Sequence, residues 1–428
     1  MKFRSIHKYI WVFLIFIAIL TACNQYENNN SPKDILSNIK EDEKDTDNIE
    51  AIKIEEKEIE NSSEENAKEE ANVLSDITEN NNITLLMVGD VLLHTKINES
   101  GKMEDGTYNY DHLFANVKED ILAADLAIVN QEVILGGTEL GLSGYPTFNG
   151  AYEVGDSLAK AGFDVILHAT NHTLDKGKKG VQNCLNFWKN TYPELAVLGI
   201  NESQKAHDSY IYVYEKDGIK VAILNYTYGT NGIKLPSDMP YIVNLLDKKL
   251  IEAHVKRAKE LADFIIVAPH WGTEYQLTPS KNQINLATYM AELGVDLVIG
   301  THPHVIQPVE WIESTNGNRM LVYYSIGNFI NSTAGTGAGV ANRMVGAMAK
   351  VTLARNEKGK VYIEEYGAEP LVTHMKTGPG LITTYKFSDY TEELASENEI
   401  IKQDSNFTFK YCIDLWNKVY ANNFALEY

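Results

Sequence analysis

The stretch AGFDVILHATNHTLDKGKKG, residues 161–180, shows the unit from which the fold of this chain can be inferred. An amphipathic pattern typical of a helix covers 154–161, and the apolar run 165–167 follows as a short buried strand. Asn171 and His172 come directly after this strand, and a second helical pattern begins a few residues later. A helix, a strand, a polar cluster and a helix in this order are typical of an α/β protein, in which functional groups lie where strands end.

The same unit recurs over most of the chain. Short runs rich in Val, Ile and Leu, without the alternation of a half-exposed strand, predict buried strands. These runs cover 83–88, 126–129, 165–167, 221–224, 264–267, 297–299 and 321–324, and a turn signal between 344–353 and 360–368 predicts a final hairpin. Helical patterns cover 154–161, 178–189, 248–262 and 282–293. We therefore predict one α/β domain with two packed sheets and outer helices.

The domain is predicted to span 83–375, with a helical extension over 376–428. Trp416, Tyr420 and Phe424 in this extension recur at the four-residue spacing of one helix face. We expect this face to pack on the domain.

The first 23 residues, MKFRSIHKYIWVFLIFIAILTAC, have the charge order of a secretory signal. Lys2, Arg4 and Lys8 precede an uncharged run that is short for a membrane-spanning helix, and the sequence before Cys23 resembles the bacterial lipobox, in which the cysteine is acylated. We predict that residues 1–22 are a lipoprotein signal peptide and that Cys23 is the lipidation site. The body would then be extracytoplasmic and anchored to the cell membrane. An uncleaved membrane helix is the alternative, and it gives the body the same location.

Residues 23–82 are predicted to be an acidic, disordered tether. They contain 18 acidic and 6 basic residues, and no sustained apolar face. The formal net charge of the whole chain is −21, so the domain is acidic as well, which argues against nucleic acid as a partner. Cys184 and Cys412 stand alone in the sequence. Their isolation excludes a zinc site built from paired cysteines and leaves a disulfide between them open.

Five predicted strands end in polar side chains of the kinds that bind metals. These side chains are Asp90, Asn130, Glu132, Asn171, His172, His270, His302 and His304. Each one has an ordinary structural explanation by itself, but parallel strands would bring their carboxyl ends to one edge of a sheet. Carboxylate, amide and imidazole donors together suit one or two divalent ions of the Mn, Fe or Zn type better than calcium, which prefers oxygen. We therefore expect a metal site at these strand ends.

Six segments in this order and spacing resemble the motif series of the CapA family, which is associated with capsule and poly-γ-glutamate synthesis. The segments are GDVLLH (89–94), ADLAIVNQE (124–132), AGFDVILHATNHTLDKGKKG (161–180), APHWGTEY (268–275), GVDLVIGTHPHVIQPVE (294–310) and YSIGNF (324–329). That family is similar in fold to the calcineurin-like metallophosphoesterases. The resemblance therefore implies a four-layer α/β/β/α sandwich with a metal site at the strand ends.

The resemblance also implies roles for individual residues. The implied metal ligands are Asp90, Glu132, Asn171, His270, His302 and His304. Glu132 stands at the position of a bridging aspartate, and His172 corresponds to a proton donor beside the leaving group. Residues that could complete the site or hold its ligands in place are His94, Asn130, Glu274, Gln307, Glu310 and Asn328. The Asp-x-His opening of the phosphoesterases is absent, because Val91 and Leu92 follow Asp90, so a mononuclear or substrate-completed site is also consistent.

Two functions of different classes fit these expectations. The first is a metal-dependent hydrolase that cleaves a phosphoester or an amide in an envelope polymer or its precursor. The second is a non-catalytic assembly or export factor that binds the carboxylates of poly-γ-glutamate through the metal. Both have an anionic envelope polymer as ligand and the membrane as the place of attachment through the N-terminal lipid. Membrane-embedded synthases are further partners that both functions would suit, and neither involves nucleic acid.

Overall fold

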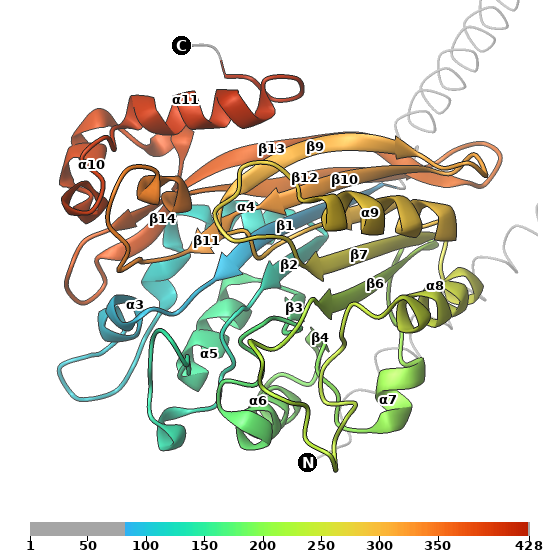
Figure 1. Cartoon of the computed structure of the whole chain (residues 1–428), viewed down its shortest axis with the longest axis horizontal. Helices are drawn as coiled ribbons and strands as arrows, with labels where there is room; N and C mark the ends of the chain where they lie inside the picture. Colours follow the sequence, from blue (N-terminus) through green and yellow to red (C-terminus); the bar gives the residue numbers. More distant parts are fainter. Residues whose placement is uncertain (1–81, 427–428) are drawn as a thin grey trace, which may run out of the picture. The chain divides into compact units, whose positions relative to one another are not determined.

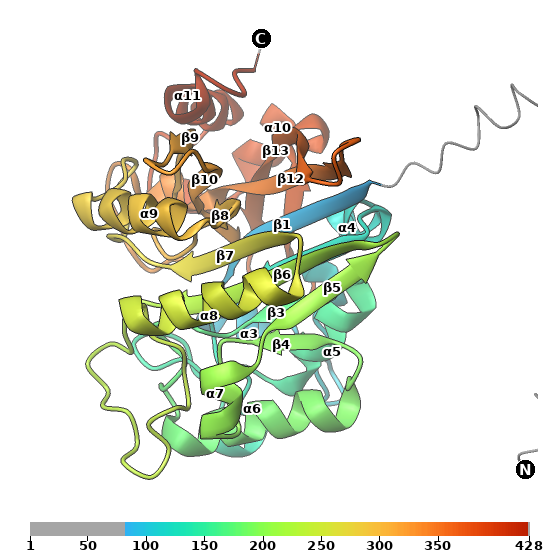
Figure 2. The same cartoon turned by 90° about the vertical axis from the view of Figure 1, so that its right-hand side faces the viewer.

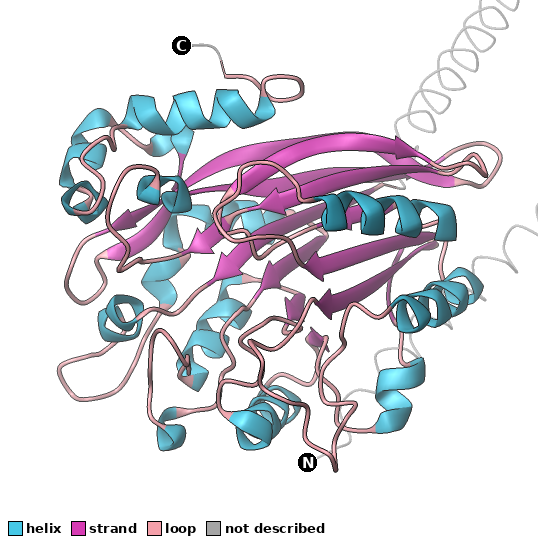
Figure 3. Cartoon of the chain, in the orientation of Figure 1, coloured by secondary structure: helices cyan, strands magenta, loops and turns pink. Residues whose placement is uncertain are grey.

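The computed structural model describes residues 82–426, so the predicted signal peptide, Cys23 and nearly all of the predicted tether lie outside the described residues. Over this range the chain forms two β-sheets with helices around them (Figures 1 and 3). None of the helices within 82–426 is long and apolar enough to cross a membrane.

The first sheet has eight strands in the order β14-β13-β12-β1-β2-β3-β4, with β11 beside β1. Its strands are β1 (Ile83–Val91), β2 (Leu126–Asn130), β3 (Val165–Leu167), β4 (Ala196–Leu198), β11 (Asn328–Ile330), β12 (Val345–Arg355), β13 (Val361–Met375) and β14 (Ile382–Lys386). The second sheet has six strands in the order β5-β6-β7-β8-β10-β9. Its strands are β5 (Tyr212–Lys216), β6 (Ile219–Thr227), β7 (Phe264–His270), β8 (Leu297–Ile299), β9 (Ile306–Glu313) and β10 (Arg319–Ile326). Strands β1 to β4 are parallel to one another, and so are β6, β7, β8 and β10.

Helices lie around the two sheets. They are α3 (Thr95–Ser100), α4 (Lys118–Ala123), α5 (Tyr152–Ala161), α6 (Gly177–Thr191), α7 (Gln204–Ser209), α8 (Lys248–Leu261), α9 (Lys281–Leu293), α10 (Glu392–Glu397) and α11 (Phe409–Tyr420). Helix α8 packs on β6 and β7, and α9 packs on β9 and β10. Helix α6 lies on the other side of the molecule, below β3 and β4 in Figure 2.

The residues of β7 show why the two sheets pack face to face. Side chains of a strand point alternately to its two faces. Phe264 and Ile266 belong to the core between the two sheets, whereas Ile265 and Val267 belong to a second core beneath α8 and α9. All four are buried, so this strand is apolar on both faces. The order helix, sheet, sheet, helix confirms the predicted four-layer sandwich.

Aspartates immediately before four parallel strands tie the start of each strand to its neighbour. Each carboxylate accepts a hydrogen bond from a backbone N–H at the beginning of the adjacent strand, and so supplies a partner for that donor. The bonds run from Thr84 N to Asp125 (2.9 Å), Ala127 N to Asp164 (2.8 Å), Lys220 N to Asp263 (3.0 Å) and Ile265 N to Asp296 (2.9 Å). These bonds help to set the strand register in both sheets, and the register in turn positions the opposite strand ends.

The predicted strands all lie within strands of the structure, and the runs 165–167 and 297–299 coincide with β3 and β8. The predicted hairpin corresponds to β12 and β13, which pair in antiparallel register. Strands β4, β5, β9, β11 and β14 have no counterpart among the predictions, because they are short or half-exposed and lack a long apolar run.

The chain after residue 376 differs from the predicted helical extension. It begins with β14, which pairs with β13, and forms helices only afterwards. Helix α11 ends at Tyr420, so Phe424 lies outside the helix, and its carbonyl oxygen accepts a hydrogen bond from Trp416 Nε1 at 2.7 Å. Trp416 and Tyr420 are buried, as their spacing led us to expect. Cys184 and Cys412 are both buried and free, so they form no disulfide with each other.

Replacing Asp296 with asparagine should stabilise the protein at neutral pH. Burial raises the pKa of Asp296 from 3.8 to about 6, so the folded state disfavours its charged form. Because the folded pKa lies above the unfolded one, the protein loses stability as the pH rises from about 4 to about 6. Asparagine keeps an oxygen that accepts the hydrogen bond from Ile265 N. Because it carries no charge at any of these pH values, it also removes the loss of stability that the buried carboxylate causes. We expect a gain in unfolding free energy on the order of 2 kcal/mol at about pH 7.5 and little gain near pH 4.

Asp125→Asn is the matched control for this substitution. At Asp125 burial is outweighed by hydrogen bonds from Lys216 and Thr84, which lower the pKa of the carboxyl, so the charged form is favoured in the folded state. The same change should therefore destabilise the protein at neutral pH. Urea denaturation over this pH range measures both variants. A gain for Asp296→Asn that is the same at every pH would contradict the explanation by burial.

Candidate metal centre

The carboxyl ends of strands from both sheets meet at one cluster of buried polar side chains. The members of this metal cluster are Asp90 at the end of β1, Glu132 after β2, Asn171 after β3, His270 at the end of β7, and His302 and His304 after β8. Each of the six exposes 4% or less of its surface. Figure 1 shows the arrowheads of β1, β2, β6 and β7 on the same side. The predicted metal ligands therefore lie together, although they come from distant parts of the sequence.

Asp90 connects the two sheets. Its Oδ1 accepts a hydrogen bond from Asn130 Nδ2 at 2.7 Å, and its Oδ2 accepts one from the backbone N–H of His302 at 3.2 Å. Asn130 lies opposite Asp90 in the neighbouring strand of the same sheet, whereas His302 follows a strand of the other sheet. The preceding Gly89 permits a close approach of two backbones, because a Cβ atom there would lie 1.9 Å from Gly327 O.

Glu132 faces histidines on two sides. Its Oε1 lies 3.6 Å from His270 Nε2, and its Oε2 lies 3.7 Å from His304 Nδ1. Both carboxylate oxygens are buried, and neither accepts a hydrogen bond from any of residues 82–426. A buried carboxylate without hydrogen bonds is costly unless a cation compensates its charge.

His270 and His302 present ring nitrogens to the same space. His270 Nδ1 lies 3.0 Å from Thr301 Oγ1 and its Nε2 lies 2.7 Å from Asn171 Oδ1, so Nε2 faces the cluster. His302 Nδ1 is buried and has no hydrogen-bond partner in the described part of the chain. Burial and the neighbouring histidines lower the pKa of His302 well below its ordinary value, so its ring stays neutral. A neutral imidazole is the form that binds a metal.

His304 approaches the carboxylates from another direction. Its Nδ1 lies 3.2 Å from Asp90 Oδ2 and 3.0 Å from Asn328 Oδ1. Burial alone would lower the pKa of His304, but the Glu132 and Asp90 carboxylates outweigh it and raise the pKa to about 9. A proton on this ring therefore balances part of the negative charge that a bound cation would otherwise balance.

The backbone is strained where it presents two of these histidines. His302 and His304 have φ angles of 97° and 59°. These lie in the left-handed region of backbone conformation, which residues other than glycine rarely adopt. Each such residue costs about 1–3 kcal/mol, and such strain persists where the surroundings enforce it. Here it directs two imidazoles separated by one proline into a single cluster.

His172 lies at the edge of the cluster and is oriented by Asp175. Its Nδ1 is 2.7 Å from Asp175 Oδ2, and the same carboxylate oxygen accepts a hydrogen bond from Phe148 N at 2.7 Å. This arrangement leaves Nε2 of His172 facing Glu132, 4.0 Å from its Oε1. Asp175 is absent from the predicted site, although its position three residues after His172 could have identified it.

Four of the six supporting residues that we predicted lie at the cluster. Asn130 and Asn328 hold Asp90 and His304 through the hydrogen bonds given above. Burial, followed by the nearby His304 and His172, lowers the pKa of His94 to about 3. Glu274 is exposed, but one of its oxygens lies within 4.8 Å of ligand atoms of His302 and His304.

Gln307 and Glu310 do not meet the expectation that they support the metal ligands. Gln307 Nε2 donates to Gln276 O at 2.8 Å, and its Oε1 accepts from Gln283 Nε2 at 2.8 Å, so it holds the loop before α9. Glu310 is exposed and accepts a hydrogen bond from Tyr324 Oη at 2.5 Å. Both lie on β9, which leads away from the strand ends where the cluster forms.

Two overlapping groups of side chains in the cluster could each hold an ion. Ligand atoms of Glu132, His270 and His302 lie within 4.8 Å of one another, and so do those of Asp90, Glu132 and His304. Glu132 belongs to both groups. Its two oxygens and Nδ1 of His302, which have no partner among residues 82–426, are acceptors that a cation would satisfy. The mixed nitrogen and oxygen set fits divalent ions of the Mn, Fe or Zn type.

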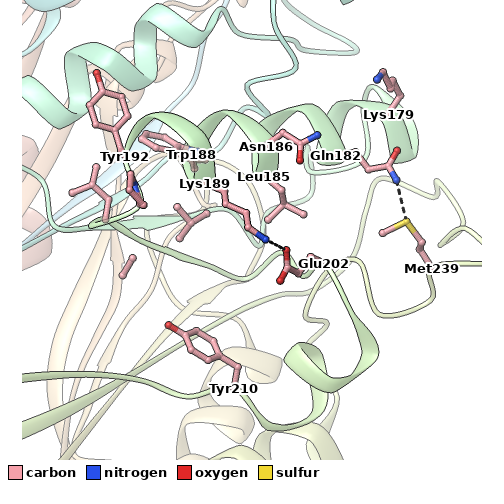
Figure 4. A pocket seen from close by; sticks show the side chains of 14 residues that line it. Lys179, Gln182, Leu185, Asn186, Trp188, Lys189, Tyr192, Glu202, Tyr210 and Met239 are labelled. Carbon is pink, nitrogen blue, oxygen red and sulfur yellow. Dashed lines mark hydrogen bonds and ion pairs between the residues drawn. The ribbon is translucent and has the colours of Figure 1, made fainter.

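A separate pocket of about 600 Å³ lies beside α6 (Figure 4). Trp188, Tyr192 and Tyr210 line it, and Lys189 Nζ pairs across it with a Glu202 oxygen at 2.8 Å. None of the residues of the metal cluster lines this pocket. The chemistry of the buried cluster, and not the size of a cavity, therefore identifies the candidate site.

Comparisons with known proteins match the region that contains the cluster. The model of the family described as bacterial capsule synthesis protein PGA_cap matches residues 84–333. The capsule biosynthesis protein CapA of Bacillus anthracis is 28% identical over 261 residues, which cover 59% of this chain and 60% of that protein. The PGA biosynthesis protein CapA of Bacillus subtilis (strain 168) is 30% identical over 169 residues, which cover 39% of this chain and 42% of that protein. The chain thus matches less than two thirds of the length of either relative.

Comparison with solved structures gives more distant matches. A putative 5′-nucleotidase from Staphylococcus aureus matches with a TM-score of 0.43 and 18% identity, over 67% of this chain and 54% of that one. The calcineurin-like phosphoesterase YfkN from Bacillus subtilis matches with a TM-score of 0.41 and 14% identity, over 77% of this chain and 98% of that one.

Adding Mn²⁺ or Zn²⁺ to the metal-free protein should stabilise it through Glu132. A ligand that binds only the folded state at about a hundred times its Kd adds about 2.7 kcal/mol. Glu132→Gln should remove most of this gain, because the amide cannot supply an anionic oxygen to either group of ligands. Glu310→Gln is the matched control, since Glu310 is an exposed carboxylate outside the cluster. Thermal unfolding with and without metal measures the stabilisation. An equal stabilisation of the parent and of Glu132→Gln would refute the assignment of Glu132 as a metal ligand.

Proposed function

This chain belongs to the bacterial capsule synthesis protein PGA_cap family, and on this basis we propose that it acts in the synthesis or export of an anionic envelope polymer such as poly-γ-glutamate. Within that role we propose a metal-dependent hydrolase that cleaves the polymer or a precursor. Two relatives named for capsule or PGA biosynthesis support the polymer assignment. The hydrolase assignment rests on the metal cluster and on His172.

The observation that best supports metal-dependent chemistry is the environment of Glu132. Its two buried oxygens face His270 and His304 and accept no hydrogen bond from the described residues. A site with a purely structural role would be expected to satisfy these acceptors with protein donors. The pattern is that of a carboxylate whose partner is a cation.

The residues around the cluster have distinct tasks in the proposed reaction. Bound divalent ions would supply Lewis-acid polarisation of the scissile group. Asp90, Glu132 and the three histidines would hold them. His172 would transfer the proton, and the contact of Asp175 with its Nδ1, which leaves its Nε2 directed at the cluster, supports this role. A water molecule would attack the scissile phosphorus or carbonyl carbon, and a proton from Nε2 would pass to the leaving oxygen or nitrogen, which completes the hydrolysis of a phosphoester or an amide.

A non-catalytic assembly or export factor is the second candidate, and the names of the two CapA relatives favour it because they refer to biosynthesis. The same cluster would then hold a cation that binds polymer carboxylates. The formal net charge of −21 makes a bridging cation useful in either case, because an acidic protein and an acidic polymer repel each other.

We also propose that the protein is extracytoplasmic and is held at the membrane by a lipid on Cys23. The signal-like first 22 residues support this location. Attachment at the membrane would keep the metal cluster near membrane-embedded synthases, which are the partners that polymer synthesis would require.

His172→Asn separates the two candidate functions. In a hydrolase it should leave metal content unchanged and lower turnover by about 10²–10⁴-fold, the usual contribution of general acid–base catalysis. His304→Asn should instead lose metal, because His304 belongs to the ligand set. His254→Asn is the matched control, since His254 is buried against Tyr226 in a different part of the fold. Metal analysis, thermal unfolding and a polymer-cleavage assay would be run on all three variants.

The outcomes of this experiment are distinct. Full polymer export by a stable, metal-loaded His172→Asn protein would exclude the hydrolase and retain the assembly factor. A large loss of stability without a selective loss of turnover would mean that His172 is structural. A metal-free parent protein would count against both candidate functions.

Cys23→Ser should leave the precursor unprocessed or release the protein from the membrane. The serine cannot accept the thioether-linked lipid, and two acyl chains are what stable attachment of a lipoprotein requires. Membrane fractionation and mass spectrometry of the mature N-terminus measure the result. A mature parent protein that still begins at Met1 would refute the predicted processing.

A further inference from the structure

Arg343 is a cation beside the metal cluster that lacks a counter-ion among residues 82–426. It lies in the short helix η4 (Val340–Met344), just before β12, and is partly buried. Its Nη1 donates one hydrogen bond, to Thr333 Oγ1 at 2.8 Å. Its Nε is buried and has no partner among the described residues. A guanidinium has five N–H donors, so the described part of the chain leaves most of the hydrogen-bonding capacity of Arg343 unused.

The guanidinium is held in place by an aromatic ring. Arg343 Cζ lies 3.6 Å from the centroid of the Tyr275 ring, which is within the range of a cation–π contact. Tyr275 is itself fixed, because its backbone N–H donates to Pro303 O at 2.7 Å, between the two histidines of the cluster. Tyr275 also has a left-handed backbone, with φ 66°. The Tyr275 ring that Arg343 contacts is thus attached by a backbone hydrogen bond to the loop that contains His302 and His304.

A second connection links Arg343 to the metal cluster through Asn328. The backbone oxygen of Arg343 accepts a hydrogen bond from Asn328 Nδ2 at 2.9 Å, and Asn328 Oδ1 lies 3.0 Å from His304 Nδ1. The Tyr275 and His304 rings are 6.0 Å apart between centroids. Arg343 is therefore connected to His304 through one intervening residue in two ways. The guanidinium is connected through the Tyr275 ring, and the backbone oxygen is connected through Asn328.

Other arginines of the fold lack this combination. Arg355 pairs with Asp263, its Nη2 lying 2.8 Å from a carboxylate oxygen. Arg319 also stacks on an aromatic ring, 4.2 Å from the centroid of Trp311, but it is exposed on β10 and far in the sheet from the strand ends. A stacked arginine that no described carboxylate neutralises, next to a cluster built to hold cations, is suited to bind an anion that the cation also contacts.

We propose that Arg343, held by the Tyr275 ring, binds a carboxylate of the anionic polymer beside the metal cluster. This inference rests on the proposed function and adds a residue that selects the substrate. The guanidinium would attract one carboxylate of the polymer and so place the adjacent bond at the cluster. In an acidic protein, it also gives the polymer a local site of attraction that needs no metal.

Binding of poly-γ-glutamate to the full-length protein in chelator tests this proposal. Without metal, Arg343→Gln should weaken binding about tenfold or more, the usual effect of losing a hydrogen-bonded charge pair. Arg343→Lys should lie between the parent and Arg343→Gln, because it keeps the charge and loses the planar fork. Arg319→Gln, which also removes a stacked arginine, should bind within about twofold of the parent. Thermal unfolding of each variant shows whether the fold is intact, and p-nitrophenyl phosphate in place of the polymer tests phosphate as the ligand.

The possible results lead to different conclusions. Equal polymer binding by the parent, Arg343→Lys and a folded Arg343→Gln would overturn the role of Arg343 and leave the proposed function standing. A loss confined to p-nitrophenyl phosphate would overturn the carboxylate assignment. Failure of the parent to bind the polymer, with or without Mn²⁺, would overturn the proposed polymer function and this inference with it. Should Arg343→Gln fail to fold, weaker binding by Arg343→Lys than by Arg319→Gln would support the proposal, and equal binding by these two variants would overturn it.

Discussion

The hydrogen bonds of the Asp90 carboxylate are the constraint on which the candidate site depends. One oxygen accepts from Asn130 in the neighbouring strand, and the other accepts from the backbone of His302, which follows a strand of the second sheet. This side chain thus ties the carboxyl ends of the two sheets together, and the contact of His270 Nε2 with Asn171 Oδ1 at 2.7 Å does so a second time. Everything else in the cluster is positioned relative to this connection, because Glu132 follows the strand of Asn130 and His304 follows His302.

The fold accepts a substantial energetic cost at this point. Two histidines have left-handed backbones, and a buried glutamate has two oxygens without hydrogen bonds from the described residues. Buried charge and strained backbone each destabilise a protein, and they persist where the surrounding structure enforces them. The apolar strands on both sides, exemplified by Phe264 and Ile265 of β7, supply the packing that holds this arrangement. The cost is therefore concentrated at the place where function is expected.

Charge explains how the parts of the site fit one another. The chain is strongly acidic, and its cluster combines Asp90 and Glu132 with three imidazoles. Positive charge in this region comes from Arg343 on the Tyr275 ring, from the proton on His304 while no cation is bound, and from any cation that the cluster holds. An anionic polymer would meet attraction at the cluster and repulsion over much of the remaining surface. The Nε2 atom of His172, whose ring Asp175 orients, faces Glu132 at the edge of this cluster.

The sequence by itself determined the α/β class, the principal buried strands and the metal-binding residue types, because apolar runs followed by polar clusters are local patterns. The sequence also led us to expect Gln307 and Glu310 beside the metal ligands, because they follow His304 closely in the chain. In the structure they contact other residues, because β9 runs away from the strand ends where the ligands lie. Only the tertiary structure revealed Asp175 as the partner of His172 and Arg343 as a neighbour of the cluster. Both depend on where a side chain points and on which strands lie side by side, and strand pairing between distant segments leaves no local signal in the sequence.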